Sequence, residues 1–338
     1  MRIRNARSII IISAYTVLNV FIISAALKQN SEEDYSLKSP GNLAPEYTKI
    51  EELNYFHLKS GVPQMSLSAL KMKSFGQEVA EFTDPKGIYN YQQKKQSMHY
   101  QAQEGIYQKA KEVLTLDGNV KVTSDEAEYL ANRVKYFFKK DLIIGQGAVT
   151  FKGIDLKSKD QIEIHSETMR ANPSNQFSRF KGGVQGSLQR QKKYEGKMTF
   201  SSDELELDGI QSLAHLDGNV KMKRQSYLIT AGKADIHLEN YNKSLKYFVF
   251  NDDVKVAETL RTAEGVSYRK AFSERLEGFG REQKMVLSGA PKVEHGEDVV
   301  KGYRITIREN MDLIEVDDAM SDVQVKRKDD KKANKLKE

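Results

Sequence analysis

The sequence contains an internal repeat. The segment LDGNVKV (Leu116–Val122) returns almost unchanged as LDGNVKM (Leu216–Met222). Weaker copies keep the same frame at every second position: Gly145-Gly147-Val149-Phe151, Phe180-Gly182-Val184-Gly186, Phe250-Asp252-Val254-Val256, Leu287-Gly289-Pro291-Val293 and Ala319-Ser321-Val323-Val325. The third position recurs every 29 to 37 residues. A period in that range indicates an architecture that grows by stacking similar units.

Each copy has the pattern of a β-strand. Apolar residues alternate with polar ones, so that Leu116, Val120 and Val122 share one face while Asn119 and Lys121 share the other. Between the copies a second alternating element recurs, at residues 127–129, 162–164, 205–207, 234–238, 266–268 and 305–307. No helical period is sustained between about residue 50 and Val325. The sequence therefore predicts an all-β fold, a long twisted antiparallel structure with an apolar inner face.

The glycines of the repeat have a local explanation. They are followed by strand rather than by a helix N-terminus, and no P-loop sequence accompanies them. Glycine within a strand is typical of a β-bulge or of a close backbone approach. We expect the repeat to bend its strands at these positions.

The N-terminal residues predict a membrane anchor. Residues 8–27 form an uncharged run of twenty residues, long enough for a helix to span a bilayer core. Three arginines in residues 1–7 precede the run and acidic residues follow it, which places residues 1–7 in the cytoplasm. The alternative is a cleaved secretory signal that ends at Ser24-Ala25-Ala26. Residues 28–48 contain two prolines and no periodicity, and they predict a linker.

The basic charge of the chain lies at its ends. The net charge is +6, but residues 1–7 carry +3 and residues 326–338 carry +4, which leaves the body at −1. A nucleic-acid partner is therefore not expected, because such proteins need a basic face. The lysine-rich residues 326–338 predict a disordered tail.

The sequence offers no pattern for catalysis, metal binding or a cofactor. Cysteine is absent, which excludes disulfides, thiolate metal sites and cysteine nucleophiles. The six histidines are scattered, without the spacing of a zinc site. The acidic residues fall at turns and on the expected outer face of strands, with no signature of a glycosidase pair. We therefore expect no catalytic residues, no metal ligands and no cofactor.

The inner face is the remaining candidate site. Its apolar residues repeat along the axis: Leu116, Val120, Val122, Val149, Phe151, Val184, Val220, Met222, Val254 and Val256. This stripe fits either ordinary core packing or a trough for lipid chains, in which each buried methylene contributes about 0.8 kcal/mol. The pattern by itself favours neither interpretation.

Several longer segments resemble a known family. The order of FHLKSGVPQMSLSAL, HYQAQEGIY and LDGNVKV after one anchor and a linker is similar to the LptC family of lipopolysaccharide-export proteins. Residues 229–256 (ITAGKADIHLENYNKSLKYFVFNDDVKV) and 287–307 (LSGAPKVEHGEDVVKGYRITI) resemble the OstA-type repeats of LptA. We accordingly divide the periplasmic part into an LptC-like segment, residues 49–200, and an LptA-like segment, residues 201–325.

The resemblance implies a fold and a function. The fold is an elongated V-shaped β-jellyroll whose interior takes the acyl chains of lipopolysaccharide, and the protein is a single-pass inner-membrane protein with a periplasmic body. Its implied partners are an inner-membrane ABC transporter and a periplasmic bridge protein. Two alternatives remain open at this stage: an anchored scaffold or adhesin with a closed core, and, less favoured, a polysaccharide-processing enzyme.

The last copy of the repeat predicts a partner edge. Ala319, Ser321, Val323 and Val325 run into the lysine-rich tail without a capping element. An uncapped edge strand recruits another strand. We expect this strand to extend the sheet of a bridge protein or of an outer-membrane acceptor, while the charged tail discourages self-stacking.

Overall fold

The computed structural model describes residues 47–59, 62–75, 78–91, 96–154, 159–190, 196–224, 226–238, 245–262, 265–308, 314–317 and 320–322. The predicted cytoplasmic segment, membrane anchor and basic tail lie outside the described residues, as does the linker apart from its last two positions. In the part of the chain that is described, no helix has the length and apolar character needed to cross a bilayer.

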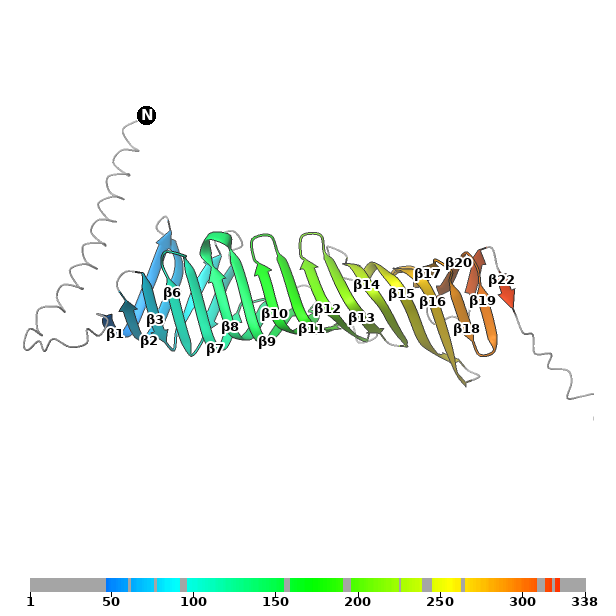
Figure 1. Cartoon of the computed structure of the whole chain (residues 1–338), viewed down its shortest axis with the longest axis horizontal. Helices are drawn as coiled ribbons and strands as arrows, with labels where there is room; N and C mark the ends of the chain where they lie inside the picture. The colour runs from blue at the N-terminus through cyan, green and yellow to red at the C-terminus, as the bar shows by residue number, and fades with distance from the viewer. Residues whose placement is uncertain are drawn as a thin grey trace, which may run out of the picture.

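The described chain is one antiparallel β-sheet, which confirms the predicted all-β fold. Figure 1 shows an elongated body in which the strands lie across the long axis and follow one another in sequence order. The first strands are β1 (Tyr47–Lys59), β2 (Val62–Phe75), β3 (Val79–Thr83), β4 (Lys86–Tyr91), β5 (Gln96–Gln101) and β6 (Glu104–Gln108).

Ten long strands build the middle of the body. They are β7 (Val113–Thr123), β8 (Ala127–Phe137), β9 (Leu142–Ile154), β10 (Gln161–Asn172), β11 (Phe177–Gln189), β12 (Lys197–Asp208), β13 (Leu213–Arg224), β14 (Tyr227–Leu238), β15 (Leu245–Thr262) and β16 (Gly265–Phe279). A single 3-10 turn, Phe138–Lys140, joins β8 to β9. The body ends with β17 (Lys284–Ser288), β18 (Lys292–His295), β19 (Asp298–Lys301), β20 (Arg304–Arg308), β21 (Ile314–Asp317) and β22 (Met320–Asp322).

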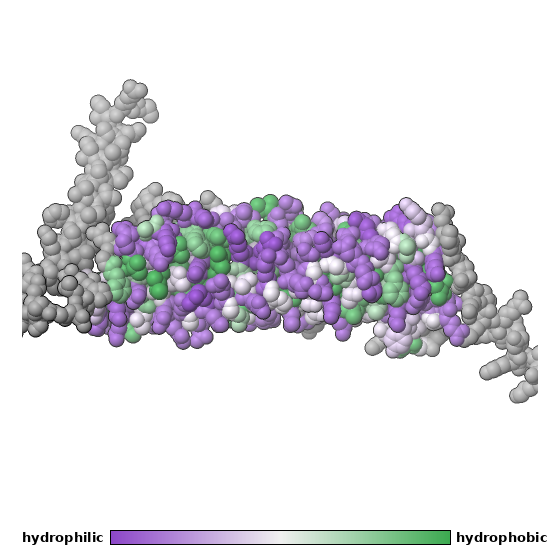
Figure 2. All heavy atoms as spheres, in the orientation of Figure 1, coloured by the Kyte–Doolittle hydropathy of each residue, from purple (hydrophilic) through white to green (hydrophobic). Residues whose placement is uncertain are grey.

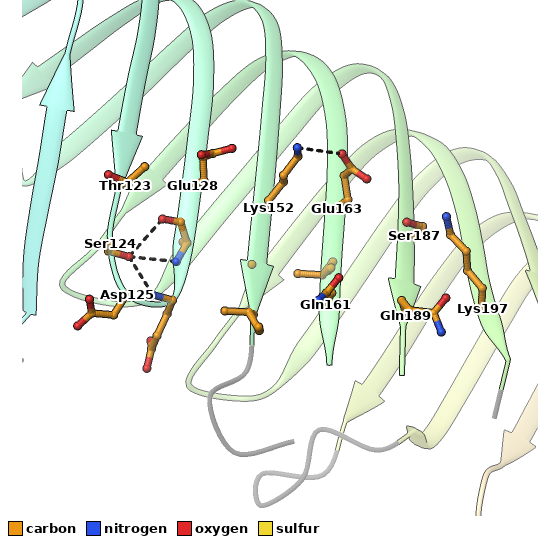
Figure 3. A pocket seen from close by; sticks show the side chains of 15 residues that line it. Thr123, Ser124, Asp125, Glu128, Lys152, Gln161, Glu163, Ser187, Gln189 and Lys197 are labelled. Carbon is orange, nitrogen blue, oxygen red and sulfur yellow. Dashed lines mark hydrogen bonds and ion pairs between the residues drawn. The ribbon is translucent and has the colours of Figure 1, made fainter. Parts of the chain in front are cut away.

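The strand pairing defines two layers. The first half of β7 pairs with β6, and its second half pairs with β5. At the other end, β16 pairs through its second half with β17 and through its first half with β18. We call the layer of β3, β6, β17 and β20 layer I, and the layer of β4, β5, β18 and β19 layer II. Strands β7 to β16 run through both, and Figure 3 shows such strands curving from a front layer over into a back layer.

The repeat forms the corner between the layers. Pairs of consecutive residues with positive φ occur in the first six copies: Gly118–Asn119, Gly147–Ala148, Gly182–Gly183, Gly218–Asn219, Asp252–Asp253 and Gly289–Ala290. The register shifts beside the first five, where two residues oppose one in the next strand. A Cβ added to Gly218 would lie 2.2 Å from a carboxylate oxygen of Asp203. The predicted bulges are thus confirmed, and they explain why glycine recurs there.

The bulges also change the phase of the strands that follow them. In β16, the residues that precede the position opposite the β15 bulge are buried at Arg269, Ala271 and Ser273, whereas after that position the inward-facing residue is Leu276. In that first part of β16 the even-numbered residues, such as Val266 and Tyr268, face outward. The predicted element Val266–Tyr268 is therefore a strand as expected, but its apolar residues are 58% and 67% exposed rather than part of the inner face.

The two layers meet at the bulged corner and approach again at their free ends. We call these free ends lip I, at the turns after β8, β10, β12, β14 and β16, and lip II, at the turns after β7, β9, β11, β13 and β15. At the N-terminal end of the body, Tyr89 of layer II packs edge-on against Tyr136 of layer I, with ring centroids 5.5 Å apart. The lips are therefore in contact at this end.

Candidate functional site

The predicted inner-face residues all point into the space between the layers. Eight of them are at most 4% exposed: Leu116, Val120, Val149, Val184, Val220, Met222, Val254 and Val256. Val122 and Phe151 are half-buried and pack against the same core. Figure 2 shows the contrast with the outside, where hydrophilic side chains cover most of the visible face. The inward placement is observed, and contact with lipid stays a prediction.

The strand register joins these side chains into rows along the body. One row on layer II comprises Tyr129, Phe151, Ile164, Gly186, Phe200, Met222, Ile229, Val256, Ala271, Val293 and Val300. No member of this row is charged. This row makes a continuous apolar wall along layer II from β8 to β19.

Side chains fill the interior. The buried residues form one hydrophobic cluster that extends from Leu67 in β2 to Ile307 in β20. Phe151 of layer II packs near Phe180 of layer I, with ring centroids 6.0 Å apart. The ring of Phe248 lies where a Cβ on Gly278 would come within 1.9 Å of it. The apolar wall is therefore closed in this structure, and access to it requires the layers to separate.

A polar hollow of about 610 Å³ lies at lip II (Figure 3). Glu128, Lys152 and Glu163 line it from neighbouring strands, and the Lys152 Nζ lies 3.8 Å from the Glu163 Oε1. Ser124 completes the local turn by accepting a hydrogen bond from the backbone N–H of Ala127. These contacts hold one turn and one strand pair at the rim of the hollow.

The described ionisable groups that stand out are one histidine–aspartate pair and two buried tyrosines. Among the described residues no three His, Asp or Glu side chains are placed to hold a metal ion. The His215 Nδ1 lies 2.5 Å from the Asp235 Oδ1, but both side chains are more than a third exposed. Burial raises the pKa of the Tyr129 phenol to about 12, and it raises the pKa of Tyr100, whose hydroxyl donates to the Ser66 carbonyl oxygen at 2.9 Å. Both phenols therefore remain neutral near pH 7.

The sequence interpretation missed charged side chains in the interior. Acidic residues were expected at turns and on outer faces, but Glu258 and Arg269 are buried and form an ion pair. Asp160 and Arg190 form another, with 3.2 Å between the Arg190 Nη1 and the Asp160 Oδ2. Extending the alternation of Val254 and Val256 by two residues would have placed Glu258 on the inner face. No pattern within β16 places Arg269 on the inner face, because the bulge in the paired strand β15 decides which residues of β16 face inward.

The fold and its interior define a class: an elongated β-repeat protein whose bent strands enclose a continuous apolar wall. The chain belongs to the family described as lipopolysaccharide-assembly, LptC-related, which matches residues 14–189, more than half of the sequence. Residues 199–312 match the family described as LptA/(LptD N-terminal domain) LPS transport protein. The resemblance of both halves is confirmed. The chain is thus a periplasm-facing component of lipopolysaccharide transport.

Solved structures include a similar protein. The crystal structure of LptH, the LptA homologous periplasmic component of the lipopolysaccharide transport device from Pseudomonas aeruginosa, has 18% sequence identity and a TM-score of 0.34. The matched region covers 39% of this chain and 90% of LptH. No curated protein matches the sequence.

Proposed function

We propose that this protein binds the acyl chains of lipopolysaccharide between its two layers and passes the lipid from an inner-membrane ABC transporter towards the outer membrane. Residues 8–27 anchor it in the inner membrane, and the β body lies in the periplasm. Transfer needs no covalent step, because the acyl chains slide between similar apolar surfaces. Its direction comes from ATP hydrolysis by the transporter.

The observation that carries this proposal is the continuity of the apolar wall. The LptC-like match ends at residue 189 and the LptA-like match begins at residue 199. Across that junction β11 and β12 pair in register, with Gly186 opposite Phe200 and Leu188 opposite Met198. An acyl chain can therefore move from one half to the other without meeting water, which would cost about 0.8 kcal/mol for each methylene exposed.

The closed interior is compatible with this role. An empty open trough would expose apolar surface at a cost of about 25 cal/mol for each Å². Closing the layers on each other removes that cost while the protein is unloaded. Acyl chains then replace side-chain contacts of the same chemical kind when the lips part.

The same closed interior favours a second candidate function. A protein whose layers never part is an anchored structural scaffold with a dry core, as in many stacked β-repeats. The two functions differ in whether the interior exchanges its contacts for a ligand. Bound lipid therefore decides between them.

The test is to purify the full-length chain from its native membrane in mild detergent and to analyse what remains bound by mass spectrometry. We expect lipid A species to co-purify with the protein. A control purification of an unrelated single-pass membrane protein measures carry-over of free lipopolysaccharide. Lipid A at the carry-over level in both samples would contradict transport and favour the scaffold.

The C-terminal end of the sheet supports a proposal about partners. Ser321, from the last copy of the repeat, lies in β22 and pairs with Val300 of β19. The other predicted edge residues, Ala319, Val323 and Val325, lie outside the described residues. Among the described strands, β22 pairs only with β19 and β21 pairs only with β20, so both leave an outer edge for a further strand. We propose that a bridge protein or an outer-membrane acceptor adds its strand here.

Crosslinking in cells tests this edge. Photo-crosslinking residues at Asp322 and Gln324 should capture a lipopolysaccharide-transport partner. Val323→Pro should abolish the capture, because proline cannot donate a hydrogen bond to the neighbouring strand. The control is Lys326→Ala, in the tail, which should leave the capture intact. A proline in a central strand, such as Lys221→Pro, would disturb the sheet itself and cannot serve as the control. Crosslinks only to a second copy of the same chain, or crosslinks that survive the proline, would refute the partner edge.

A further inference from the structure

An ion pair is buried inside the C-terminal half of the body. Glu258 of β15 and Arg269 of β16 are opposite each other in the strand register. Their side chains are 2% and 1% exposed. The guanidinium donates to the Glu258 Oε2 from Nη2 at 2.5 Å and from Nε at 3.1 Å. The pair thus belongs to the interior rather than to the surface.

The same guanidinium reaches the opposite layer. Arg269 lies in the part of β16 that pairs with β18, in layer II. Its Nη2 also donates to the backbone carbonyl oxygen of Arg308, at 3.4 Å. Arg308 is the last residue of β20, and it pairs with Lys284 at lip I. This hydrogen bond therefore connects the two layers across the opening between the lips.

The stability of the fold does not explain the pair. The Glu258 Oε1 is buried without a hydrogen-bond partner, so its desolvation is only partly compensated. Replacing a buried ion pair by apolar side chains of similar volume is often neutral or stabilising. A nearby hydroxyl, the Ser267 Oγ, is also buried without a hydrogen-bond partner. Buried polar groups at this position are explained better by a role in controlling the separation of the two layers than by a contribution to stability.

The residues beside the pair show that the lip changes character along the body. In the N-terminal half, the row that leads to this position along layer II consists of Ala127, Gly153, Ile162, Leu188 and Met198. Its continuation in the C-terminal half consists of Arg224, Tyr227, Glu258, Arg269 and His295. The Arg224 Nη1 donates to the Tyr227 hydroxyl at 3.3 Å. Apolar contacts give way to directional hydrogen bonds in the second half.

We propose that Glu258 and Arg269 form a latch that holds the lips together over the C-terminal half of the apolar interior. The inference rests on the proposed function, because it is the passage of acyl chains that requires the lips to part. An acyl chain replaces the apolar contacts of the N-terminal half with contacts of the same kind. It offers no replacement for the bond from Arg269 to the Arg308 carbonyl. The C-terminal half therefore opens only when the latch is released.

The test measures separation of the lips without lipopolysaccharide. The chain contains no cysteine, so spin labels can be placed at Lys270→Cys in layer II and Glu282→Cys at lip I without removing native thiols. Both positions are exposed. Full-length protein in phospholipid nanodiscs is then compared by pulsed electron paramagnetic resonance with the variant Glu258→Gln/Arg269→Met. We expect the population with long inter-label distances to rise about tenfold or more, the order expected for loss of a hydrogen bond to a charged group.

A matched control comes from the outer face. Arg179 and Glu204 form an ion pair between the adjacent strands β11 and β12, with side chains 40% and 20% exposed. Arg179→Met/Glu204→Gln removes the same chemistry without touching the opening. It should leave the distance distribution unchanged. An equal rise in this variant would overturn the latch, because the effect would then be general loosening.

Adding lipopolysaccharide separates the two hypotheses. A rise in the long-distance population without lipid supports the latch whether or not lipid binds. If that rise occurs but neither protein retains lipopolysaccharide, the latch stands and the transport function fails. If both proteins bind lipopolysaccharide and their distributions in the absence of lipid are the same, the latch is refuted and the transport function stands.

Discussion

Val220→Asp is expected to abolish lipopolysaccharide binding and to lower the free energy of unfolding by about 3–5 kcal/mol, the range for an uncompensated buried charge. Val220 is 1% exposed and follows directly on the bulge of β13. A carboxylate there has the apolar wall as its surroundings, with no cation provided to pair with it. Chemical denaturation and a lipopolysaccharide-binding assay on the same preparation measure both effects.

The neighbouring residue provides the control. Lys221 is exposed on the outer face of the same strand, opposite Thr230 of β14. Lys221→Asp should change the free energy of unfolding by less than about 0.5 kcal/mol, as is usual for surface substitutions. It should also leave lipid binding intact. Equal binding and equal stability of the two variants would show that the inner face has been assigned wrongly.

Arg269→Met should lower the free energy of unfolding by about as much as Val220→Asp, because it leaves the Glu258 carboxylate buried without its cation. Breaking one partner of a buried ion pair typically lowers the free energy of unfolding by about 3–5 kcal/mol. The loss here adds to that of the hydrogen bond to the Arg308 carbonyl. Denaturant titration of the full-length protein, followed by circular dichroism, measures the change.

The double variant shows whether the cost is that of an unpaired charge. Glu258→Gln/Arg269→Met removes both charges at nearly constant volume, so most of the lost stability should return. If the double variant is as unstable as Arg269→Met, the shape of the arginine side chain matters rather than its charge. A small effect of Arg269→Met by itself would contradict the burial of the pair.

Part of the fold could be predicted from the repeat. The alternation of LDGNVKV and LDGNVKM placed Val120 and Val220 on an inner face, and both are 1% exposed. The glycines predicted bends, and Gly118 and Gly218 have φ near +77° and +76° within bulges. These features are local, since side-chain parity and backbone conformation depend on only a few neighbouring residues.

Features that depend on more than one strand could be obtained only from the tertiary structure. The phase of β16 is set by the two aspartates at the bulge of β15, so the exposure of Tyr268 and the burial of Arg269 could not be obtained from β16 by itself. The pairing of each long strand with both layers likewise joins residues that are far apart in the sequence, such as Arg269 and Arg308. The sequence by itself determined a stack of bent strands with an apolar inner face. The packing of the two layers against each other decides whether that face is closed and which polar bond closes it. Packing acts between strands, so the sequence of a single strand does not reveal it.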